Sequence, residues 1–456
     1  MTTHTASGPG PATKRNIVSF FVALFERFMP DPFALAILLT LVVGILAVAF
    51  APHADARTLL NSWFSGMFNI LAFGFQMILI LATGHALATA PAVRRLLRAL
   101  VSAVASPAQA AVLVFVVVGI AAYLNWGLGL VVGAFLAREI ARRFPVDFGW
   151  LVAAAYSAWS ICNSGLSSSI ALSQASHGSS LNIVEKETGH IMPLSDSIFT
   201  LYTLLPTLLV LVVMCVLFIL MRPPASQAVP LAQEEAPVAS ERVRTGTSVA
   251  HWLESSPLGT ILIVIAGAAY LALDWQKSGF SLELNTLILL FLLVGMALQG
   301  TPIAYATAIR EAARQTGSIL LQFPFYGGIM GIMIGTGLAG EISKFFTTIA
   351  NADTLPVWSY VSSLIITLLV PSAGGHWAVQ GPFVVPATLA LHASLPASTM
   401  AVAMAENVSN MIQPFWAVPI VAIAGIGIQR VMGFTVVTFL VSLVIYGSTI
   451  ILLGRV

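Results

Sequence analysis

Long apolar segments occupy most of this chain, and they limit what it can fold into more than any other feature does. A helix needs about 20 apolar residues to cross the hydrocarbon core of a bilayer. Nine segments of roughly this length are visible: 33–51, 66–88, 149–175, 194–220, 257–275, 283–299, 315–338, 398–428 and 432–454. Only 8% of the residues are charged, against about a quarter in a soluble domain. The sequence therefore predicts an all-α polytopic membrane protein with about nine spanning helices.

Two further apolar stretches, 109–137 and 357–392, are interrupted near the middle by Gly-rich polar residues. Arg98 precedes the first stretch and Arg138 follows it. Because basic residues accumulate on the cytoplasmic side of a membrane, both ends of this stretch are expected there. Each arm is shorter than the ~20 residues of a full span, which favours a re-entrant hairpin over two spans. The second stretch has no Lys or Arg at either end and is expected to enter from outside.

The first 30 residues show no cleavable signal peptide. Apolar residues from Ile17 to Phe28 follow helical spacing, and Glu26 and Arg27 interrupt the run. This pattern predicts a short helix on the cytoplasmic membrane surface, with the frayed start of the first span as the alternative. With the N-terminus inside, all but five of the 20 Lys and Arg residues fall on the cytoplasmic side, and this bias supports the topology. The five exceptions are Arg57, Lys186, Lys277, Lys344 and Arg455.

Two halves of the chain match in the order of their features. In each half a short amphipathic segment precedes a proline, a Gly-rich hairpin tip and an asparagine. Gly127 pairs with Gly374 and Asn163 pairs with Asn410 at one constant offset. The expected topology turns the second half upside down, and inverted repeats with broken helices are typical of secondary transporters.

The repeat and its connections divide the chain into five expected parts. Residues 222–256 are rich in Pro, Ala and charge, which is typical of a flexible linker. The two repeats contain the hairpins 109–137 and 357–392 and the broken helices 149–175 and 398–428. The parts are a cytoplasmic tail with a surface helix (1–30), the first repeat (31–221), the cytoplasmic linker (222–256), an extra spanning helix (257–280) and the second repeat (281–456).

Four polar interruptions are expected at membrane depth. The hairpin tips read "YLNWGLGL" and "PSAGGHWAVQG", and the broken helices read "WSICNSGLSSS" and "AENVSNMIQPFW". Irregular backbone at this depth is tolerated only inside the protein or beside a watery cavity. Because the repeat pairs these interruptions, they predict one shared site.

The chemistry of this expected site favours a small monoanion. The N-termini at helix breaks present unpaired N–H groups and a positive dipole end to an anion, and unpaired carbonyls suit a cation. No Lys or Arg is expected at the middle of the membrane. A phosphate or a dicarboxylate would therefore lack a permanent positive partner, unless a bound cation supplies one.

Two ionisable side chains, Glu406 and His376, are expected at membrane depth and are candidates for a role in transport. Glu406 is the one carboxylate well inside an expected span, and such groups are costly and typically functional. We expect Glu406 and Ser409 to hold a proton or a cation, with a protonated glutamate bonded to the helix break as the alternative. His376, beside Gly374 and Gly375, is the histidine expected at the substrate, with a purely structural hydrogen bond as the alternative.

Other classes of protein find little support in the sequence. It contains no Walker, HExxH or GxSxG sequence, so no ATP-driven pump or hydrolase is predicted. Cys162 and Cys215 lie in apolar contexts, which argues against a disulfide framework or a thiolate metal site. A passive channel stays open as an alternative, because paired re-entrant hairpins also occur in channels. Four tryptophans lie near the interruptions and either line a pocket or simply pack: Trp126, Trp159, Trp377 and Trp416.

Several stretches resemble the short-chain fatty acid transporter family from about residue 15 to the end. They include "NWGLGLVVGAFLAREIARR", "ILLQFPFYGGIMG", "PSAGGHWAVQGPFVVPA" and "NMIQPFWAVPIVAIAGI". The resemblance implies a secondary transporter of the bacterial inner membrane that takes up monocarboxylates such as butyrate or acetoacetate by cation symport. The alternatives are a passive anion channel and a carrier of another small organic anion such as a dicarboxylate. No cofactor is expected beyond a coupling Na⁺ or H⁺.

This family in turn resembles a wider superfamily of ion transporters. That likeness implies an elevator mechanism, a homodimer, and arm helices at 92–104 and 341–350. It also implies that the hairpin tips and helix breaks form the substrate site. Together with His376, the residues assigned to the site are Asn125, Asn163, Ser164, Ser372, Gly374, Gly375, Asn407 and Asn410.

Overall fold

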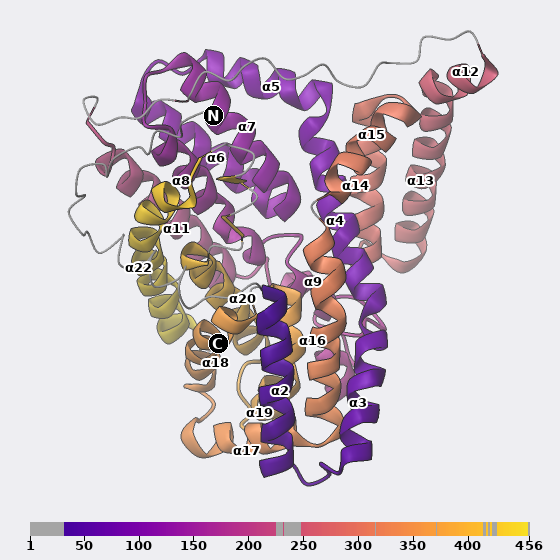
Figure 1. The fold of residues 1–456 in the computed structure, drawn as a ribbon, viewed down its shortest axis with the longest axis vertical. Helices are drawn as coiled ribbons and strands as arrows, with labels where there is room; N and C mark the ends of the chain where they lie inside the picture. Colours follow the sequence, from indigo (N-terminus) through magenta and orange to yellow (C-terminus); the bar gives the residue numbers. More distant parts are fainter. Residues whose placement is uncertain are drawn as a thin grey trace, which may run out of the picture.

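The computed structural model is helical throughout the part of the chain that it describes, and no strand occurs there (Figure 1). The described residues are 32–224, 231, 248–314, 316–370, 372–413, 416–417, 420–421 and 426–454. The expected surface helix in 1–30 lies outside these residues, as does most of the expected linker 222–256.

Among the described residues, six helices are long and apolar enough to cross a membrane, or seven if one bent pair is counted as a span. The six are α2 (Pro32–Phe50), α3 (Ala56–Asn69) continuing into α4 (Leu71–Thr89), α6 (Pro107–Leu124), α11 (Leu201–Leu220), α13 (Pro257–Ser278) and α22 (Ile428–Leu453). The bent pair is α16 (Gly317–Gly335) with α17 (Leu338–Ile349). Five of the six match expected spans, and α6 is an arm of the expected hairpin 109–137. Of the other four expected spans, 149–175 and 398–428 are broken, 283–299 forms the short helix α14 (Leu284–Gln299), and 315–338 belongs to the bent pair.

One group of helices surrounds the long α3–α4 rod. The rod covers 34 residues, which is roughly 50 Å at the helical rise, and α16 runs beside it. Glycines bring the two together: a Cβ on Gly66 would lie 2.2 Å from the carbonyl oxygen of Gly327, and one on Gly331 would lie 2.1 Å from that of Ser62. Small residues allow this approach between membrane helices. The helices α2, α14 and α15 (Pro302–Ala313) pack against this pair, and α13 packs outside them.

The span expected at 66–88 begins earlier in the structure, because residues 56–65 are also helical. They form most of α3, whose N-terminus is capped by Asp55 through the backbone N–H groups of Arg57 and Thr58. The polar side chains of this segment interrupt its apolar run, so hydropathy alone places the start of the span too late.

The second group of helices contains two antiparallel hairpins. In the first, α6 and α7 (Trp126–Arg143) meet at Asn125. In the second, α18 (Leu355–Leu369) and α19 (Ala373–Ala390) meet near Ser372. The lengths of these helices do not decide between a re-entrant hairpin and two spans, so the re-entrant path stays a prediction.

Two broken helices lie against these hairpins. The first consists of α8 (Phe148–Trp159), the 3₁₀ turn η1 (Ser160–Ser164) and α9 (Ser169–Gln174). The second consists of α20 (Leu395–Ser409) and the 3₁₀ turn η3 (Asn410–Ile412). Both breaks fall at the polar sequences that predicted them. Shorter elements complete the described chain: α10 (Ile183–Thr188), η2 (Leu194–Asp196) and α12 (Val249–Ser255).

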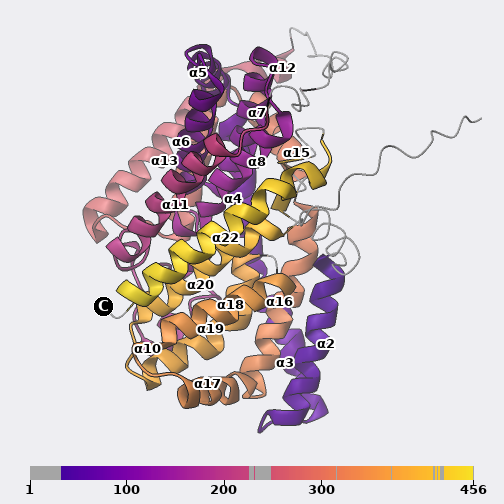
Figure 2. The ribbon, with the colours of Figure 1, turned by 90° about the vertical axis from the view of Figure 1, so that its left-hand side faces the viewer.

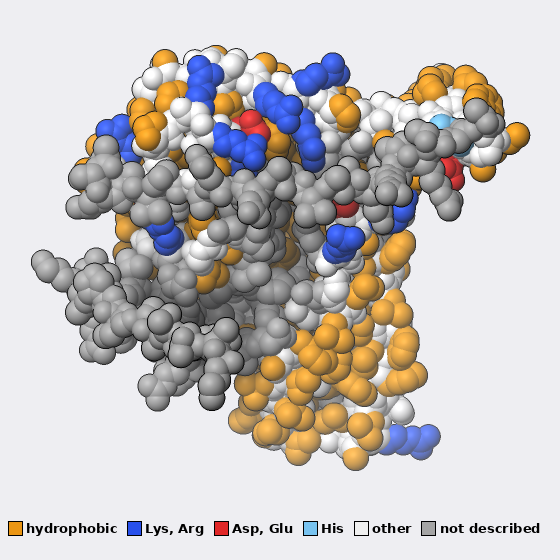
Figure 3. All heavy atoms as spheres, turned by 45° about the horizontal axis from the view of Figure 1, so that its top comes forward, with side chains coloured by type: hydrophobic (Ala, Val, Ile, Leu, Met, Phe, Trp, Pro, Cys, Tyr) orange, Lys and Arg blue, Asp and Glu red, His pale blue; other side chains and the backbone are white. Residues whose placement is uncertain are grey.

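Two amphipathic helices lie at opposite ends of the molecule (Figures 1 and 2). They are α5 (Pro91–Ser102) and α17, close to the expected arms 92–104 and 341–350. Lys and Arg side chains gather at the end that carries α5 (Figure 3), where Arg94, Arg95 and Arg98 are exposed. This placement is the one that the predicted inverted repeat requires, and the repeat itself stays a prediction.

Candidate functional site

The two helix breaks meet inside the molecule. The side-chain oxygen of Asn407 accepts a hydrogen bond of 3.0 Å from the backbone N–H of Asn163. Its side-chain nitrogen donates to the Ser164 hydroxyl at 2.8 Å. Tyr156 of α8 donates to the backbone carbonyl of Asn410 at 2.5 Å. These buried bonds join the two breaks and satisfy backbone groups that the interrupted helices leave free.

Each hairpin tip contacts one of the breaks. In the first half, the backbone N–H of Leu166 donates to the carbonyl of Tyr123 at 2.7 Å, and that of Trp126 donates to the Ser167 hydroxyl at 2.9 Å. In the second half, the side chain of Gln413 donates to the backbone carbonyl of Thr367. The tips and breaks therefore form one connected region, as the sequence predicts.

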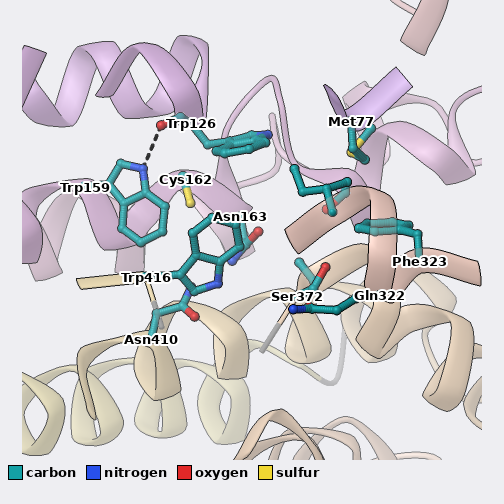
Figure 4. A pocket seen from close by; sticks show the side chains of 13 residues that line it. Met77, Trp126, Trp159, Cys162, Asn163, Gln322, Phe323, Ser372, Asn410 and Trp416 are labelled. Carbon is teal, nitrogen blue, oxygen red and sulfur yellow. Dashed lines mark hydrogen bonds between the residues drawn. The ribbon is translucent and has the colours of Figure 1, made fainter. Parts of the chain in front are cut away.

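A pocket opens where this region faces α4 and α16 (Figure 4). The cavity has a volume of about 50 Å³, and the atom-free space is about 560 Å³ when the part open to solvent is included. It is lined by Met77, Trp126, Trp159, Cys162, Asn163, Ser169, Ile319, Gln322, Phe323, Ser372, Ala373, Asn410 and Trp416. The hairpin tips and breaks thus supply one wall, and the α4–α16 pair supplies the other.

The pocket is apolar on much of its surface and polar at a few points. Trp416 lies between Trp126 and Trp159, with ring centroids 5.5 and 5.7 Å away (Figure 4). The indole of Trp159 donates to the backbone carbonyl of Trp126 at 2.8 Å. Amides and hydroxyls provide the polar atoms, and none of the 13 described lining residues is charged. Ser372 caps the N-terminus of α19, so the first N–H groups of that helix begin at the pocket.

Three of the expected substrate residues line this pocket: Asn163, Ser372 and Asn410. The structure places them together from three different elements, and two of them are the asparagines that the repeat pairs. Ser164 and Asn407 lie in the junction of the breaks instead. Ser409 is buried at the end of α20 and is not among the lining residues.

Three other expected residues support the site without lining it. Asn125 caps α7 through the N–H of Leu128 and donates to the carbonyl of Ile80 at 3.1 Å. At Gly374 a Cβ would lie 2.6 Å from the ring of Phe73, and at Gly375 it would lie 2.4 Å from that of Tyr326. These glycines therefore let α19 approach α4 and α16 closely, which an alanine would prevent.

His376 and Glu406 form a fully buried pair that is not part of the pocket lining. The distance from His376 Nδ1 to Glu406 Oε1 is 2.6 Å, and both side chains are 0% exposed. Thr367 Oγ1 lies 3.0 Å from His376 Nδ1, and Gln380 Oε1 contacts His376 Nε2. The sequence raised structural alternatives for both residues separately but did not pair them with each other.

The sequence did not predict the wall formed by α4 and α16. Met77, Ile319 and Phe323 resemble ordinary packing residues of an apolar span. Gln322 is the one residue of this wall that could have been predicted from the sequence, because it is a polar amide within an apolar run. In the structure it is buried and accepts a hydrogen bond from Tyr326. The part of the chain that the structure describes holds no group of three or more His, Cys, Asp or Glu side chains suited to a metal ion.

The profile of the short-chain fatty acid transporter family matches residues 14–453. The chain belongs to this family. A protein of Escherichia coli (strain K12), assigned as a short-chain fatty acid transporter, is 42% identical over 435 residues, which are 94% of this chain and 98% of that protein. A protein of Haemophilus influenzae (strain ATCC 51907 / DSM 11121 / KW20 / Rd) with the same assignment is 40% identical over 425 residues, or 91% and 95% of the two chains.

The fold of this family member also resembles a solved structure. It is the crystal structure of the YdaH transporter of Alcanivorax borkumensis, described as having an unusual topology, with a TM-score of 0.62 and 17% identity. The match covers 93% of this chain and 98% of that one. The predicted all-α polytopic fold is confirmed, and this member of the short-chain fatty acid transporter family is a multi-pass membrane transporter rather than an enzyme.

Proposed function

We propose that this transporter takes up short-chain monocarboxylates such as butyrate and acetoacetate, together with a monovalent cation. The pocket between the helix breaks and α16 carries the proposal. Its tryptophan and phenylalanine side chains suit a short alkyl chain. Asn163, Asn410, Ser372 and the first N–H groups of α19 suit a carboxylate.

The charge of the pocket supports a monoanion. A buried anion is stable only when it is paired or well hydrogen-bonded, and none of the 13 described lining residues is positively charged. A dicarboxylate or a phosphate would bring two charges into this space. One negative charge can instead be offset by one co-transported cation, which is the basis for proposing symport.

The position of the pocket supports an elevator mechanism. The hairpins and broken helices form one wall and α4 with α16 form the other. In the proposed cycle the group that contains the hairpins and broken helices slides along the group around α3–α4 and carries the substrate. The helices α5 and α17 connect the two groups at opposite ends. We propose that the protein is a homodimer in the bacterial inner membrane with its N-terminus in the cytoplasm.

Uptake into proteoliposomes tests this function. The purified protein is supplied with labelled butyrate or acetoacetate under an imposed proton or sodium gradient, and protein-free liposomes correct for passage of the undissociated acid through lipid. We expect accumulation above the equilibrium level and competition between the two substrates. Equilibration without accumulation would indicate a channel, and preferred uptake of succinate or phosphate would contradict the substrate class.

A further inference from the structure

The buried pair of His376 and Glu406 has an arrangement of hydrogen bonds that determines how many protons it holds. Gln380 Nε2 donates to the carbonyl of Ser359 at 3.0 Å, so the orientation of this amide is fixed and its Oε1 is an acceptor. Because Gln380 Oε1 contacts His376 Nε2, that nitrogen must carry a hydrogen. A contact of 2.6 Å between His376 Nδ1 and Glu406 Oε1 likewise requires one proton between the two atoms. Whichever atom carries it, the pair is neutral overall.

The second oxygen of Glu406 has no such partner. Oε2 is buried and lacks a hydrogen-bond donor among the described residues. The same holds for Oδ1 of Asn410, which caps the C-terminus of α20 one turn after Glu406. It also holds for Oε1 of Gln413, which follows the 3₁₀ turn η3. Gln413 Nε2 donates to the backbone carbonyl of Thr367, and the hydroxyl of Thr367 lies 3.4 Å from Glu406 Oε1. Two of these acceptors, on Glu406 and Gln413, therefore belong to side chains that contact Thr367.

A positive charge bound at Glu406 Oε2 would remove the cost of leaving this buried oxygen unpaired. Leaving a buried acceptor unpaired costs about 1–3 kcal/mol. A proton bound to Oε2 turns this acceptor into a donor, and the side-chain oxygens of Asn410 and Gln413 are buried acceptors without a donor among the described residues. The proton also gives the pair a net charge of +1, which offsets the −1 of a carboxylate in the pocket that Asn410 lines.

We propose that the coupling cation of this transporter is a proton, that it binds at Oε2 of Glu406, and that His376 positions this carboxyl group. The proposal rests on the proposed uptake of monocarboxylates. In the cycle, Oε2 takes up one proton with the substrate anion on one side of the membrane. The same O–H bond breaks on the other side, so one proton and one anion cross together without net charge.

Other titratable groups around the pair do not take this role. The uncharged ones on neighbouring elements are phenols and a thiol, which are neutral near pH 7 at their ordinary pKa values. They are Tyr156, Cys162, Tyr326, Tyr360 and Tyr446. The charged groups on those elements are engaged elsewhere: Arg430 of α22 pairs with Asp147 at 2.9 Å, Glu341 and Lys344 of α17 pair with each other, and Glu185 of α10 pairs with His177. Lys186 and Glu187 of α10 are exposed.

The test compares net accumulation with exchange in proteoliposomes. Wild-type protein should accumulate labelled acetoacetate under a proton gradient without sodium, and a sodium gradient at equal pH should not drive accumulation. Exchange of internal labelled substrate for external unlabelled substrate is measured in parallel, since exchange needs translocation but no net release of the proton. Protein-free liposomes correct both measurements for leakage.

Glu406→Gln is the decisive variant, because glutamine resembles the protonated carboxyl group but cannot release its proton. We expect exchange to persist while proton-driven accumulation falls to the level of protein-free liposomes. Glu341→Gln, the same change at the exposed pair on α17, should leave both unchanged. If Glu406→Gln does not fold, His376→Gln replaces it, and that variant should keep exchange and shift the pH dependence of accumulation.

The outcomes separate the two proposals. Wild-type protein that neither exchanges nor accumulates monocarboxylates would contradict the proposed function itself. Wild-type exchange with accumulation driven by sodium would keep that function and overturn the proton proposal. Full proton-driven accumulation in Glu406→Gln, or loss of exchange in a well-folded Glu406→Gln, would overturn it as well.

Discussion

At the scale of single residues, Asn410 combines two separate tasks. Its backbone carbonyl accepts from Tyr156 and holds the break in place. Its side chain lines the pocket and has an oxygen without a donor among the described residues. The two tasks use different atoms, so a substitution can remove the second and leave the first.

Asn410→Ala is therefore expected to weaken uptake while the protein still folds. A hydrogen bond to a charged group is worth about 1.5–3 kcal/mol, which corresponds to roughly a 10- to 100-fold loss of apparent affinity. Uptake of labelled butyrate at several concentrations measures this, and size-exclusion chromatography checks folding. Asn61→Ala on the exposed face of α3 is the matched control. Unchanged uptake by Asn410→Ala would remove this side chain from the substrate site.

At the scale of elements, the contact of α3 with α16 depends on glycines. Gly327, Gly331 and Gly335 recur every four residues on α16, and each would bring a Cβ within 2.5 Å of an atom on α3 or in the turn that follows it. This contact builds the wall against which the hairpins are proposed to slide. The helix α16 thus needs small residues to pack against α3, although none of these glycines lines the pocket.

Gly331→Val is expected to destabilise the protein by about 1–3 kcal/mol, the usual penalty for overpacking. The melting temperature in detergent should fall relative to wild type. Gly44→Val is the control, because a Cβ there meets nothing within 4 Å. Equal melting temperatures for the two variants would show that the close approach of α3 and α16 is not required.

At the scale of the whole molecule, the two amphipathic arms mark opposite ends. Arginines gather at the α5 end (Figure 3), and basic residues favour the cytoplasmic side. This asymmetry supports the proposed orientation, in which α5 faces the cytoplasm.

Single cysteines on the arms test the orientation. A membrane-impermeant thiol reagent added to intact cells should label Lys344→Cys on α17 and not Arg95→Cys on α5, and inverted vesicles should show the reverse. Both positions are exposed. The parent chain, whose Cys162 is buried and Cys215 half-buried, measures the background. Labelling of Arg95→Cys in intact cells would reverse the proposed topology.

Apolar runs, their polar interruptions and the amphipathic arms were readable in the sequence, because each depends on local composition and helical spacing. The short amphipathic segment before Pro107 thus predicted α5 (Pro91–Ser102), and "SICNSG" predicted the break at η1. The start of α3 was missed, since polar side chains in 56–65 interrupt its apolar run while a local cap from Asp55 still starts the helix.

Tertiary structure alone decided which of these residues meet. Asn163 and Asn410 were paired by the repeat, but only folding places Ser372 and Gln322 around the same pocket. The contact of His376 with Glu406 joins α19 to α20 across 30 positions. The sequence determined that a buried acid and a histidine exist at membrane depth. Their pairing depends on how α18, α19 and α20 pack, because hydrogen bonds of this kind form between side chains that only the packing of helices brings within reach.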